Sequence, residues 1–362
     1  MSFGRAYYSC PSCDGGFCPR DQQLGLCETS LSPGVTRMVA IVGATVSFEE
    51  GAELLTELAG IEVDAKLVER EAEALGAEIA DDERRVVEEG FHRPVVQTMY
   101  LGLDGTGVPM RAAEVKGRHG KQEDGTSKTR EVKLCVTWTA ESRDKDGIPI
   151  RDPGSVSYSA AIESAAMADT QDHLSEVAER VNREAHRRRF FDAPRRAVLG
   201  DGAAFIWNTF EELFPGAIQI LDRFHAKEHL VDAAAAIWPL DNDNRRRWRD
   251  ARMDELDDGN VDLLVKRLMV HAGHCKEAVD CANYFRNNQH RMRYADFRAA
   301  GLCTSTGVVE AGCKHAIGTR LKRPGMHWTV RGANAIIALR CAKLSNRLDP
   351  FLSRRSALRQ AA

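Results

Sequence analysis

Three carboxylates stand where they could act together as ligands. Asp104 ends the apolar stretch 95–104, Asp201 follows the apolar run 197–199, and Glu310 lies in a stretch of helical spacing that begins near Ser305. Hard divalent cations prefer oxygen ligands, and Mg²⁺ usually accepts a few carboxylates and keeps several waters. Two such ions about 3.5–4 Å apart activate a nucleophile and stabilise the leaving oxygen of an in-line phosphoryl displacement. We therefore predict that Asp104, Asp201 and Glu310 are catalytic ligands of Mg²⁺ or Mn²⁺, with helix capping as the alternative role.

The stretch 195–230 must position two of the carboxylates. Its apolar runs 197–199 and 217–221 are typical of short buried strands, and each stops at an aspartate, Asp201 or Asp222, that precedes residues of helical spacing. In open α/β sheets, ligands bind at the carboxyl ends of the strands. The pattern predicts strand, carboxylate, helix, strand, carboxylate, helix.

The flanking segments predict the rest of an α/β fold. Strands are expected over 95–104, 131–140 and 155–162, with Gly105-Thr106-Gly107 as a tight turn after the first, and a long helix over 167–189. The order strand, strand, strand, helix, strand, helix, strand suits a ribonuclease-H-like fold. Strand signals disappear after 230, which predicts an all-helical insertion over 231–302 that interrupts this domain.

Residues before the sheet predict a small cysteine knuckle and then helices. Cys10 and Cys13 form a CxxC pair, and Cys18 and Cys27 follow. Four thiolates are a ligand set of structural Zn²⁺; because the second pair is unusually spaced, a half-site or a turn without metal are the alternatives. The helices expected over 48–60 and 65–79 have the outline of a helix-turn-helix. Acidic residues on the second helix would repel phosphate, which favours a packing role.

The predicted organisation is a partial zinc-knuckle-like segment at 1–34 and a helical region at 35–93. The ribonuclease-H-like core follows in two parts, 94–230 and 303–348, separated by the insertion at 231–302 and followed by a frayed tail at 349–362.

Charge is unevenly distributed along the 362 residues. Residues 49–89 hold fifteen Asp and Glu against four Lys and Arg, whereas residues 311–362 hold eleven Lys and Arg against one Asp, within a net charge of −3. This asymmetry indicates that the C-terminal part meets a polyanion. The longest uncharged apolar stretch, 38–48, is too short for a membrane span, no secretory signal is evident, and the scattered cysteines indicate reduced thiols and a cytoplasmic location.

Several motifs together resemble a known family. The residues YLGLDGTGVPMR, VLGDGAAFIWN, ILDRFHAKEHL and STGVVEAGCKHAIGTRLKRPGMHW resemble, in this order, the DDE transposases of bacterial insertion sequences. The branch with most resemblance is related to the mutator-like group and has an Asp/Cys-x-x-His motif after the fifth strand. The resemblance covers roughly residues 6–348.

The resemblance implies roles for individual residues. Asp104, Asp201 and Glu310 match the three metal ligands. Asp222 and His225 match the Asp-x-x-His pair, which supports the site by hydrogen bonding or contacts DNA at the cut, with Asp222 as a direct ligand as the less favoured option. The basic residues near Glu310 gain a role as contacts to DNA phosphates, with a solvated surface as the alternative: Lys314, Arg320, Lys322, Arg323 and Arg331. Trp328 stacks on an unpaired base or belongs to the core.

The implied reaction is phosphodiester hydrolysis at transposon ends, followed by attack of the freed 3′-hydroxyl on target DNA. Transposon-end and target double-stranded DNA are then the partners, with a homodimer or higher oligomer on DNA, no membrane, and a nucleoid-associated location. In such proteins a further CxxC pair usually precedes the segment that matches residues 7–16, so we expect an N-terminal truncation. A catalytically inactive DNA-binding remnant is the alternative function.

Overall fold

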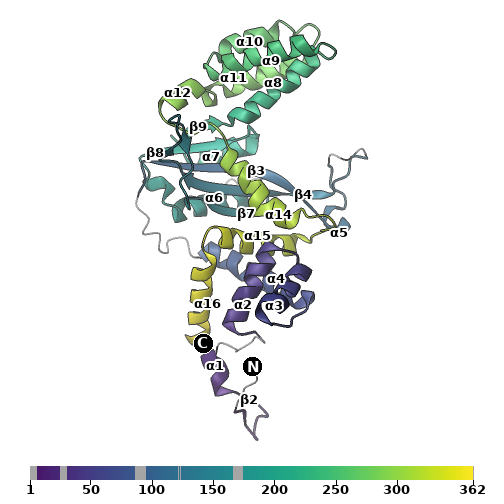
Figure 1. The fold of residues 1–362 in the computed structure, drawn as a ribbon, viewed down its shortest axis with the longest axis vertical. Coiled ribbons are helices and arrows are strands. Elements are labelled where there is room, and N and C mark those ends of the chain that lie inside the picture. Colours follow the sequence, from purple (N-terminus) through teal and green to yellow (C-terminus); the bar gives the residue numbers. More distant parts are fainter. Residues whose placement is uncertain are drawn as a thin grey trace.

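The computed structural model describes residues 6–24, 31–85, 95–120, 122, 124–165 and 174–361. Its centre is a five-stranded sheet that separates two helical regions, as Figure 1 shows. The N-terminal helices lie below the sheet in this view, and the insertion helices lie above it. None of the helices within these ranges combines the length and the apolar character that crossing a membrane requires.

The sheet has the strand order β7-β4-β3-β8-β9. Strand β4 is antiparallel to both of its neighbours, whereas β3, β8 and β9 run parallel. Their bounds are Thr98–Pro109 for β3, Thr129–Thr139 for β4, Ser157–Ala161 for β7, Arg195–Gly200 for β8 and Ile218–Leu221 for β9. This mixed α/β sheet is compatible with the ribonuclease-H-like fold expected from the sequence.

Helices connect the parallel strands, because such strands need crossover connections. Helix α6 (Glu176–Arg187) precedes β8, and α7 (Ala204–Leu213) joins β8 to β9. The sequence analysis began the first of these helices at Met167. Residues 166–173 lie outside the described residues, and Ser175 caps the helix with its side chain, so Leu174 precedes the helix.

Strand β3 is longer than the sequence predicts. Gly105, Thr106 and Gly107 continue the strand instead of forming a turn, and they pair with β4 as far as Pro109↔Thr129. A side chain at Gly105 would meet the Glu131 carboxylate of β4 at 2.2 Å. The two glycines therefore allow β3 and β4 to approach closely, although in the sequence they resemble a turn.

Alternation along β4 assigns a helix to each face of the sheet. Helix α13 (Gly307–Gly312) covers the face to which Leu134 and Val136 point, because a side chain at Gly312 would touch both residues. The opposite face is covered by α6 and the residue that follows it, Arg188. The core between these layers includes Trp138, whose ring stacks on Tyr100 at 5.4 Å.

The helical region before the sheet contains one helix that the sequence analysis missed. Ser32 caps α2 (Pro33–Thr45), α3 spans Phe48–Ala59 and ends at Gly60 with a positive φ of 63°, and α4 spans Ala65–Arg85, six residues beyond its expected end. Helix α4 packs on α15 (Val330–Leu344), where Gly76 meets the backbone of Ala335. This contact agrees with a packing role for the helix pair.

A buried ionic cluster fastens the C-terminal helices to the sheet. Glu184 of α6 is fully buried and accepts hydrogen bonds from Ser157 of β7, from Arg187 at 2.6 Å and from Arg347 at 2.8 Å. The positive charges of Arg347 and Arg187 outweigh burial and lower the pKa of Glu184 to about 2.

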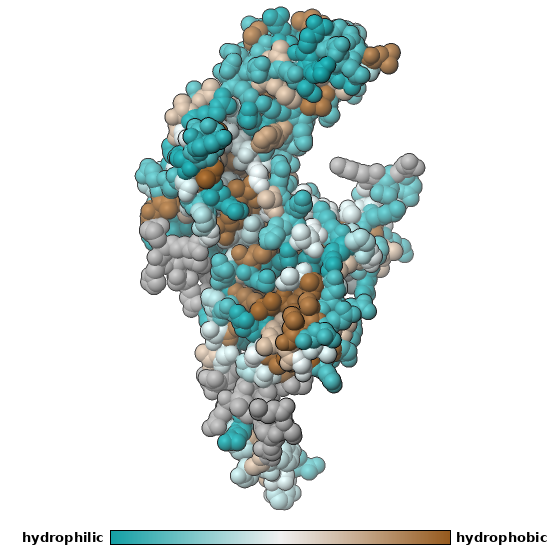
Figure 2. Space-filling model, in the orientation of Figure 1, coloured by the Kyte–Doolittle hydropathy of each residue, from teal (hydrophilic) through white to brown (hydrophobic). Residues whose placement is uncertain are grey.

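The insertion between β9 and α13 is helical throughout its described residues, as expected. Its elements are α8 (Arg223–Ile237), α9 (Asn242–Asp257), α10 (Val261–Met269), α11 (Lys276–Asn288), η2 (Gln289–Arg291) and α12 (Tyr294–Ala299). Figure 2 shows a largely hydrophilic surface on this part of the molecule.

The chain after α13 ends in a helix and not in a frayed tail. A π-helical stretch, η3 (Cys313–Gly318), and the short α14 (Thr319–Leu321) lead to α15, and α16 spans Leu348–Ala361. Arg355 of α16 bonds to Glu78 of α4 at 2.5 Å. Such ion pairs with α4 stabilise α16 as a helix, although its polar sequence alone does not predict them.

The remaining elements are short. They are β1 (Tyr8–Ser9), β2 (Gly16–Phe17), α1 (Pro19–Leu24), α5 (Ala112–Val115), β5 (Ser142–Arg143), β6 (Pro149–Ile150) and η1 (Phe190–Asp192).

Candidate active site

Parallel pairing places Asp104 and Asp201 at one edge of the sheet. The register of β3 and β8 ends with Gly102 opposite Leu199, and continued for two residues it sets Asp104 opposite Asp201. Asp104 therefore lies in the middle of β3 but just beyond its pairing with β8, and Asp201 directly follows β8. Asp104 also pairs with Leu134, whose side of the sheet is covered by α13.

The Asp104 carboxylate lies in a partly buried, negatively charged environment. Its Oδ1 accepts a hydrogen bond from the backbone N–H of Gly105 at 2.6 Å, and its Oδ2 accepts one from the Cys313 thiol at 3.2 Å. Burial is the main cause that raises the pKa of Asp104, and the negative charges of Asp201 and Glu131 raise it further. A bound cation would relieve this repulsion.

Glu310 approaches the same place from helix α13. Its side chain is exposed, and Cys313, which donates to Asp104, lies one turn further along the same continuous helix. Burial raises the pKa of Glu310, with added contributions from the charges of Asp222 and Asp104. The charge of Asp201 thus acts on Asp104, and the charge of Asp104 acts on Glu310.

The three carboxylates are electrostatic neighbours but do not form an assembled cage. Within the described ranges, no group of three or more His, Cys, Asp or Glu side chains is close enough to hold a metal ion. The donor set itself is of the type that hard divalent cations prefer, since all three groups are carboxylates. The raised pKa values of Asp104 and Glu310 fit carboxylates that lie near other negative charges in the absence of a cation.

Asp222 joins the segments that carry Asp201 and Glu310. It is fully buried and caps α8 by accepting a hydrogen bond from His225 N–H at 2.9 Å. Its other carboxylate oxygen accepts bonds from the backbone N–H, at 2.5 Å, and the hydroxyl of Thr306, the N-cap residue of α13. The N–H of Asp222 donates to the carbonyl of Gly200, next to Asp201, at 2.9 Å.

His225 lies on the first turn of α8. Its side chain is 38% exposed, and its Nδ1 lies 3.2 Å from a Glu228 oxygen. The charge of His225 lowers the pKa of Glu310, against the larger effect of burial, so the imidazole is within electrostatic reach of that carboxylate. Asp222 therefore links the starts of α8 and α13, and the His225 ring, half-exposed, contacts Glu228 and the ring of His229.

The insertion adds a residue that sequence reasoning missed. Tyr284 of α11 points its hydroxyl at the Asp201 carbonyl oxygen, 3.4 Å away, and its ring lies 3.9 Å from that of His229. A side chain at Gly202, where φ is +102°, would meet the Tyr284 hydroxyl at 2.9 Å. The amphipathic spacing of the sequence predicted a helix at this tyrosine, but it did not indicate that the tyrosine contacts the turn after β8.

The basic residues after Glu310 divide into exposed and buried groups. Lys314, Lys322 and Arg331 are exposed, and the Lys322 amine donates a hydrogen bond to the Thr106 hydroxyl of β3. Arg323 is bound to Glu50 of α3 at 2.8 Å. Lys322 therefore holds a positive charge near Asp104, two residues along the same strand.

Arg320, predicted to contact DNA phosphates, is buried instead, and Trp328 belongs to the core, which was the alternative to base stacking. The Arg320 guanidinium has no exposed surface, donates to the Gly43 carbonyl at 2.9 Å, and lies between the rings of Phe48 and Trp328. Trp328 is 7% exposed and donates to the Leu321 carbonyl at 3.0 Å. Both residues hold the helices of the N-terminal region against the chain after α14.

The N-terminal cysteines lie apart from this site. Cys10 and Cys13 occupy the turn of the β1–β2 hairpin and are exposed, Cys18 is half-buried, and Cys27 lies outside the described residues. Hydrogen bonds from the backbone of Ser12 and from the Cys13 side chain lower the pKa of Cys10. A lowered thiol pKa favours the thiolate that binds metals.

Comparisons with known proteins give little further support. No protein-family model and no curated protein matches the chain. Among solved structures, the "Drosophila P element transposase strand transfer complex" is similar with 10% sequence identity, 93% of this chain and 84% of that chain covered, and a TM-score of 0.29. At this level of similarity the match adds no argument to those drawn from the sheet and the carboxylates.

Proposed function

We propose that this chain is a DDE transposase that cleaves phosphodiesters at transposon ends and transfers the 3′-hydroxyl to target DNA. The observation that carries the proposal is that Asp104 and Asp201 lie opposite each other just beyond the paired part of the adjacent parallel strands β3 and β8, with Glu310 within electrostatic reach of Asp104. Transposon-end and target DNA would be its partners, bound by a homodimer or higher oligomer in the nucleoid.

In this proposal Asp104, Asp201 and Glu310 hold Mg²⁺ or Mn²⁺. Bound ions of this kind supply an activated water or hydroxyl and charge stabilisation at the leaving oxygen. Asp222 keeps the start of α13, and with it Glu310, against the end of β8 through its bonds to Thr306 and Gly200. Tyr284 supports the backbone of Asp201 from the insertion.

Exposed cations would neutralise DNA phosphates beside the carboxylates. Lys322 is fixed against Thr106 of β3, and Lys314 extends from the helix that carries Glu310. Figure 2 shows that the surface is hollowed between the insertion helices and the arm formed by the β3–β4 loop. Because β3 runs into this arm, the hollow lies on the side to which the carboxyl end of β3 points.

The test is a cleavage and strand-transfer assay with the full chain, Mg²⁺ or Mn²⁺, a target plasmid, and a donor plasmid that carries the DNA flanking the gene. We expect nicks at the element boundaries and joined products, both lost in Asp104→Asn, Asp201→Asn and Glu310→Gln. Asp296→Asn is the matched control, because Asp296 is an exposed carboxylate of the insertion helix α12.

Two outcomes would overturn the proposal. Cleavage that persists in all three variants would remove the carboxylates from the reaction. Salt-sensitive DNA binding without cleavage under any metal condition would instead favour the inactive DNA-binding remnant.

A further inference from the structure

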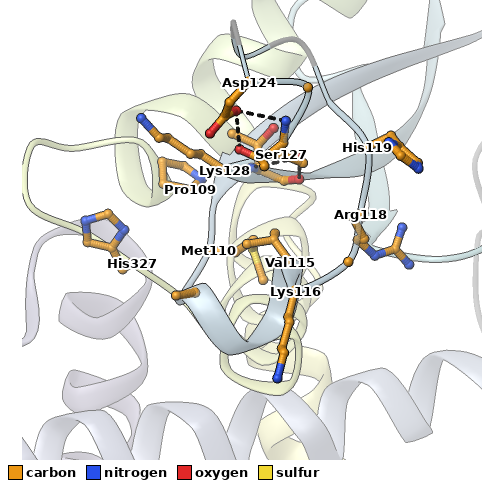
Figure 3. Close-up of a pocket in the computed structure, with 15 residues that line it drawn as sticks. Pro109, Met110, Val115, Lys116, Arg118, His119, Asp124, Ser127, Lys128 and His327 are labelled. Atoms are coloured by element: carbon orange, nitrogen blue, oxygen red, sulfur yellow. Dashed lines mark hydrogen bonds between the residues drawn. The ribbon is translucent and has the colours of Figure 1, made fainter.

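A pocket of about 800 Å³ opens beside the far end of β3, at the base of the β3–β4 loop. Figure 3 shows Met110 and Val115 on one side, with Ser127 and Lys128 across the opening from them and His327 at its edge. This volume lies within the range of small-molecule sites. Neither the carboxylates nor the basic residues predicted from the sequence line this pocket.

Two chain segments fix the apolar side of the pocket. Met110 is 3% exposed, and its N–H donates to the Lys128 carbonyl at 3.0 Å. A parallel bridge joins Met110 to Trp328, with Trp328 N–H donating to the Pro109 carbonyl at 3.1 Å. His327 is thereby held next to Met110 although more than two hundred residues separate them in the sequence.

The rim of the pocket is positively charged. Lys116, Arg118 and Lys128 are exposed, and among the described residues none of the three forms an ion pair. Among the described residues, Asp124 is the one carboxylate that lines the pocket, and it accepts bonds from the N–H and hydroxyl of Thr126, at 3.0 and 2.7 Å. An apolar wall with cations around its mouth suits a ligand with one flat apolar face and attached phosphates.

We infer that this pocket receives a single unpaired nucleotide of the DNA strand that is processed at Asp104. The base would stack on the half-buried Val115 side chain and on the exposed His327 ring, since histidine and apolar side chains stack on splayed bases. Lys128 and Arg118 would contact its flanking phosphates.

Strand β3 provides the path from this pocket to the carboxylates. Asp104 and Pro109 are five residues apart on β3, which corresponds to about 16 Å of extended strand. Lys322, bonded to Thr106, lies between them and supplies a cation for the intervening phosphates. The inference therefore rests on the proposed function for the identity of the strand but not for the binding event itself.

The test measures binding without cleavage. A fluorescein-labelled duplex with a single-stranded tail containing 2-aminopurine is compared with a blunt duplex of the same sequence, by fluorescence anisotropy in EDTA. Stacking of one base predicts that the wild-type chain binds the tailed duplex about tenfold more tightly, with quenching of the 2-aminopurine. Arg118→Ala combined with Lys128→Ala should remove this preference and reduce the salt-dependence slope by about 1.4.

Two further variants separate a local effect from a general one. Val115→Glu places a negative charge in the pocket without touching the rim, and it should abolish both the preference and the quenching. Lys276→Ala is the matched control, because Lys276 is an exposed lysine at the start of α11 in the insertion. Circular dichroism and thermal unfolding of each variant show whether it folds.

The results decide between this inference and the proposed function. Equal wild-type affinity for tailed and blunt duplexes, or a tail preference that survives in both pocket variants, would overturn the inference. Asp104→Asn should keep the preference. A chain that prefers the tailed duplex but cleaves no DNA would contradict the proposed function and leave the pocket assignment supported.

Discussion

Replacing Asp222 with alanine should disconnect Glu310 from the sheet edge. The Asp222 carboxylate accepts bonds from His225 N–H on α8 and from the N–H and hydroxyl of Thr306, which caps α13. Loss of the α8 cap costs about 1 kcal/mol. The Thr306 N–H loses its acceptor in a buried place, which costs a further amount of about 1–3 kcal/mol.

These two terms predict a loss of about 2–4 kcal/mol in the free energy of unfolding. The measurement is urea denaturation of the wild-type and variant chains, followed by the cleavage assay under conditions in which both are folded. We expect cleavage to fall far more than the folded fraction, because α13 starts at Thr306 and carries Glu310 one turn later.

Two comparison variants isolate the bond to Thr306. Asp222→Asn keeps an oxygen that caps α8 but presents an N–H group to the Thr306 N–H, so it should recover about 1 kcal/mol of stability and little cleavage. Asp64→Ala removes an exposed cap of α4, whose bond to Leu67 N–H is 2.6 Å, and should cost about 1 kcal/mol with cleavage unchanged. Full cleavage in folded Asp222→Ala would refute the positioning role.

Three further predictions concern the framework of the site. Glu184→Gln should lower stability by about 3–5 kcal/mol at neutral pH, because it leaves the buried guanidinium of Arg187 without its charged partner. The folded-state pKa of Glu184 is about 2, below its ordinary value of 4.5. The stabilisation by Glu184 is therefore complete above about pH 4.5 and is lost as the pH falls towards 2. Acid unfolding of the wild-type and variant chains, followed by circular dichroism, measures this pH range. Gly76→Ala should cost at least about 2 kcal/mol in urea denaturation, because its Cβ would lie 2.0 Å from the Ala335 carbonyl oxygen. Tyr284→Ala should cost about 2–3 kcal/mol and slow cleavage. Tyr284→Phe keeps the ring against His229 and should keep most of the stability, but it removes the hydroxyl at the Asp201 carbonyl and should slow cleavage in part; an unaffected Tyr284→Ala would remove the insertion from the site.

The strands of the sheet were predictable because local pattern determines them. Each of the strands β8 and β9 is a short apolar run that ends at an aspartate, and both appear within two residues of their expected bounds. The supporting role expected for Asp222 stays a prediction, and sequence spacing gave no signal of its bond to Thr306. The partners lie 84 residues apart in the chain.

Features that depend on distant partners were predicted poorly. Gly105 and Gly107 resemble a turn in sequence, but pairing with β4 extends the strand through them. Arg320 was assigned to DNA because it follows Glu310 closely, yet its guanidinium points into the protein to meet Gly43, 277 residues away. Nearness along a helix does not specify which face a side chain occupies.

The polar C-terminal helix was missed for a related reason. Residues after Asp349 lack a strong apolar stripe, so the pattern favoured a frayed tail. In the structure, Arg354 and Arg355 of α16 pair with Asp82 and Glu78 of α4. Ion pairs with a helix from the other end of the chain stabilise what local sequence alone would leave undetermined.

Binding of Mn²⁺ to the full chain, followed by electron paramagnetic resonance, tests most directly whether Asp104, Asp201 and Glu310 form a metal centre. We predict that the wild-type chain and Asp296→Asn bind Mn²⁺ equally, and that Asp104→Asn, Asp201→Asn and Glu310→Gln each weaken binding at least about tenfold, since loss of even an outer-shell partner has an effect of that size. Equal Mn²⁺ affinity in all five chains, or no binding in the wild-type chain, would contradict the account.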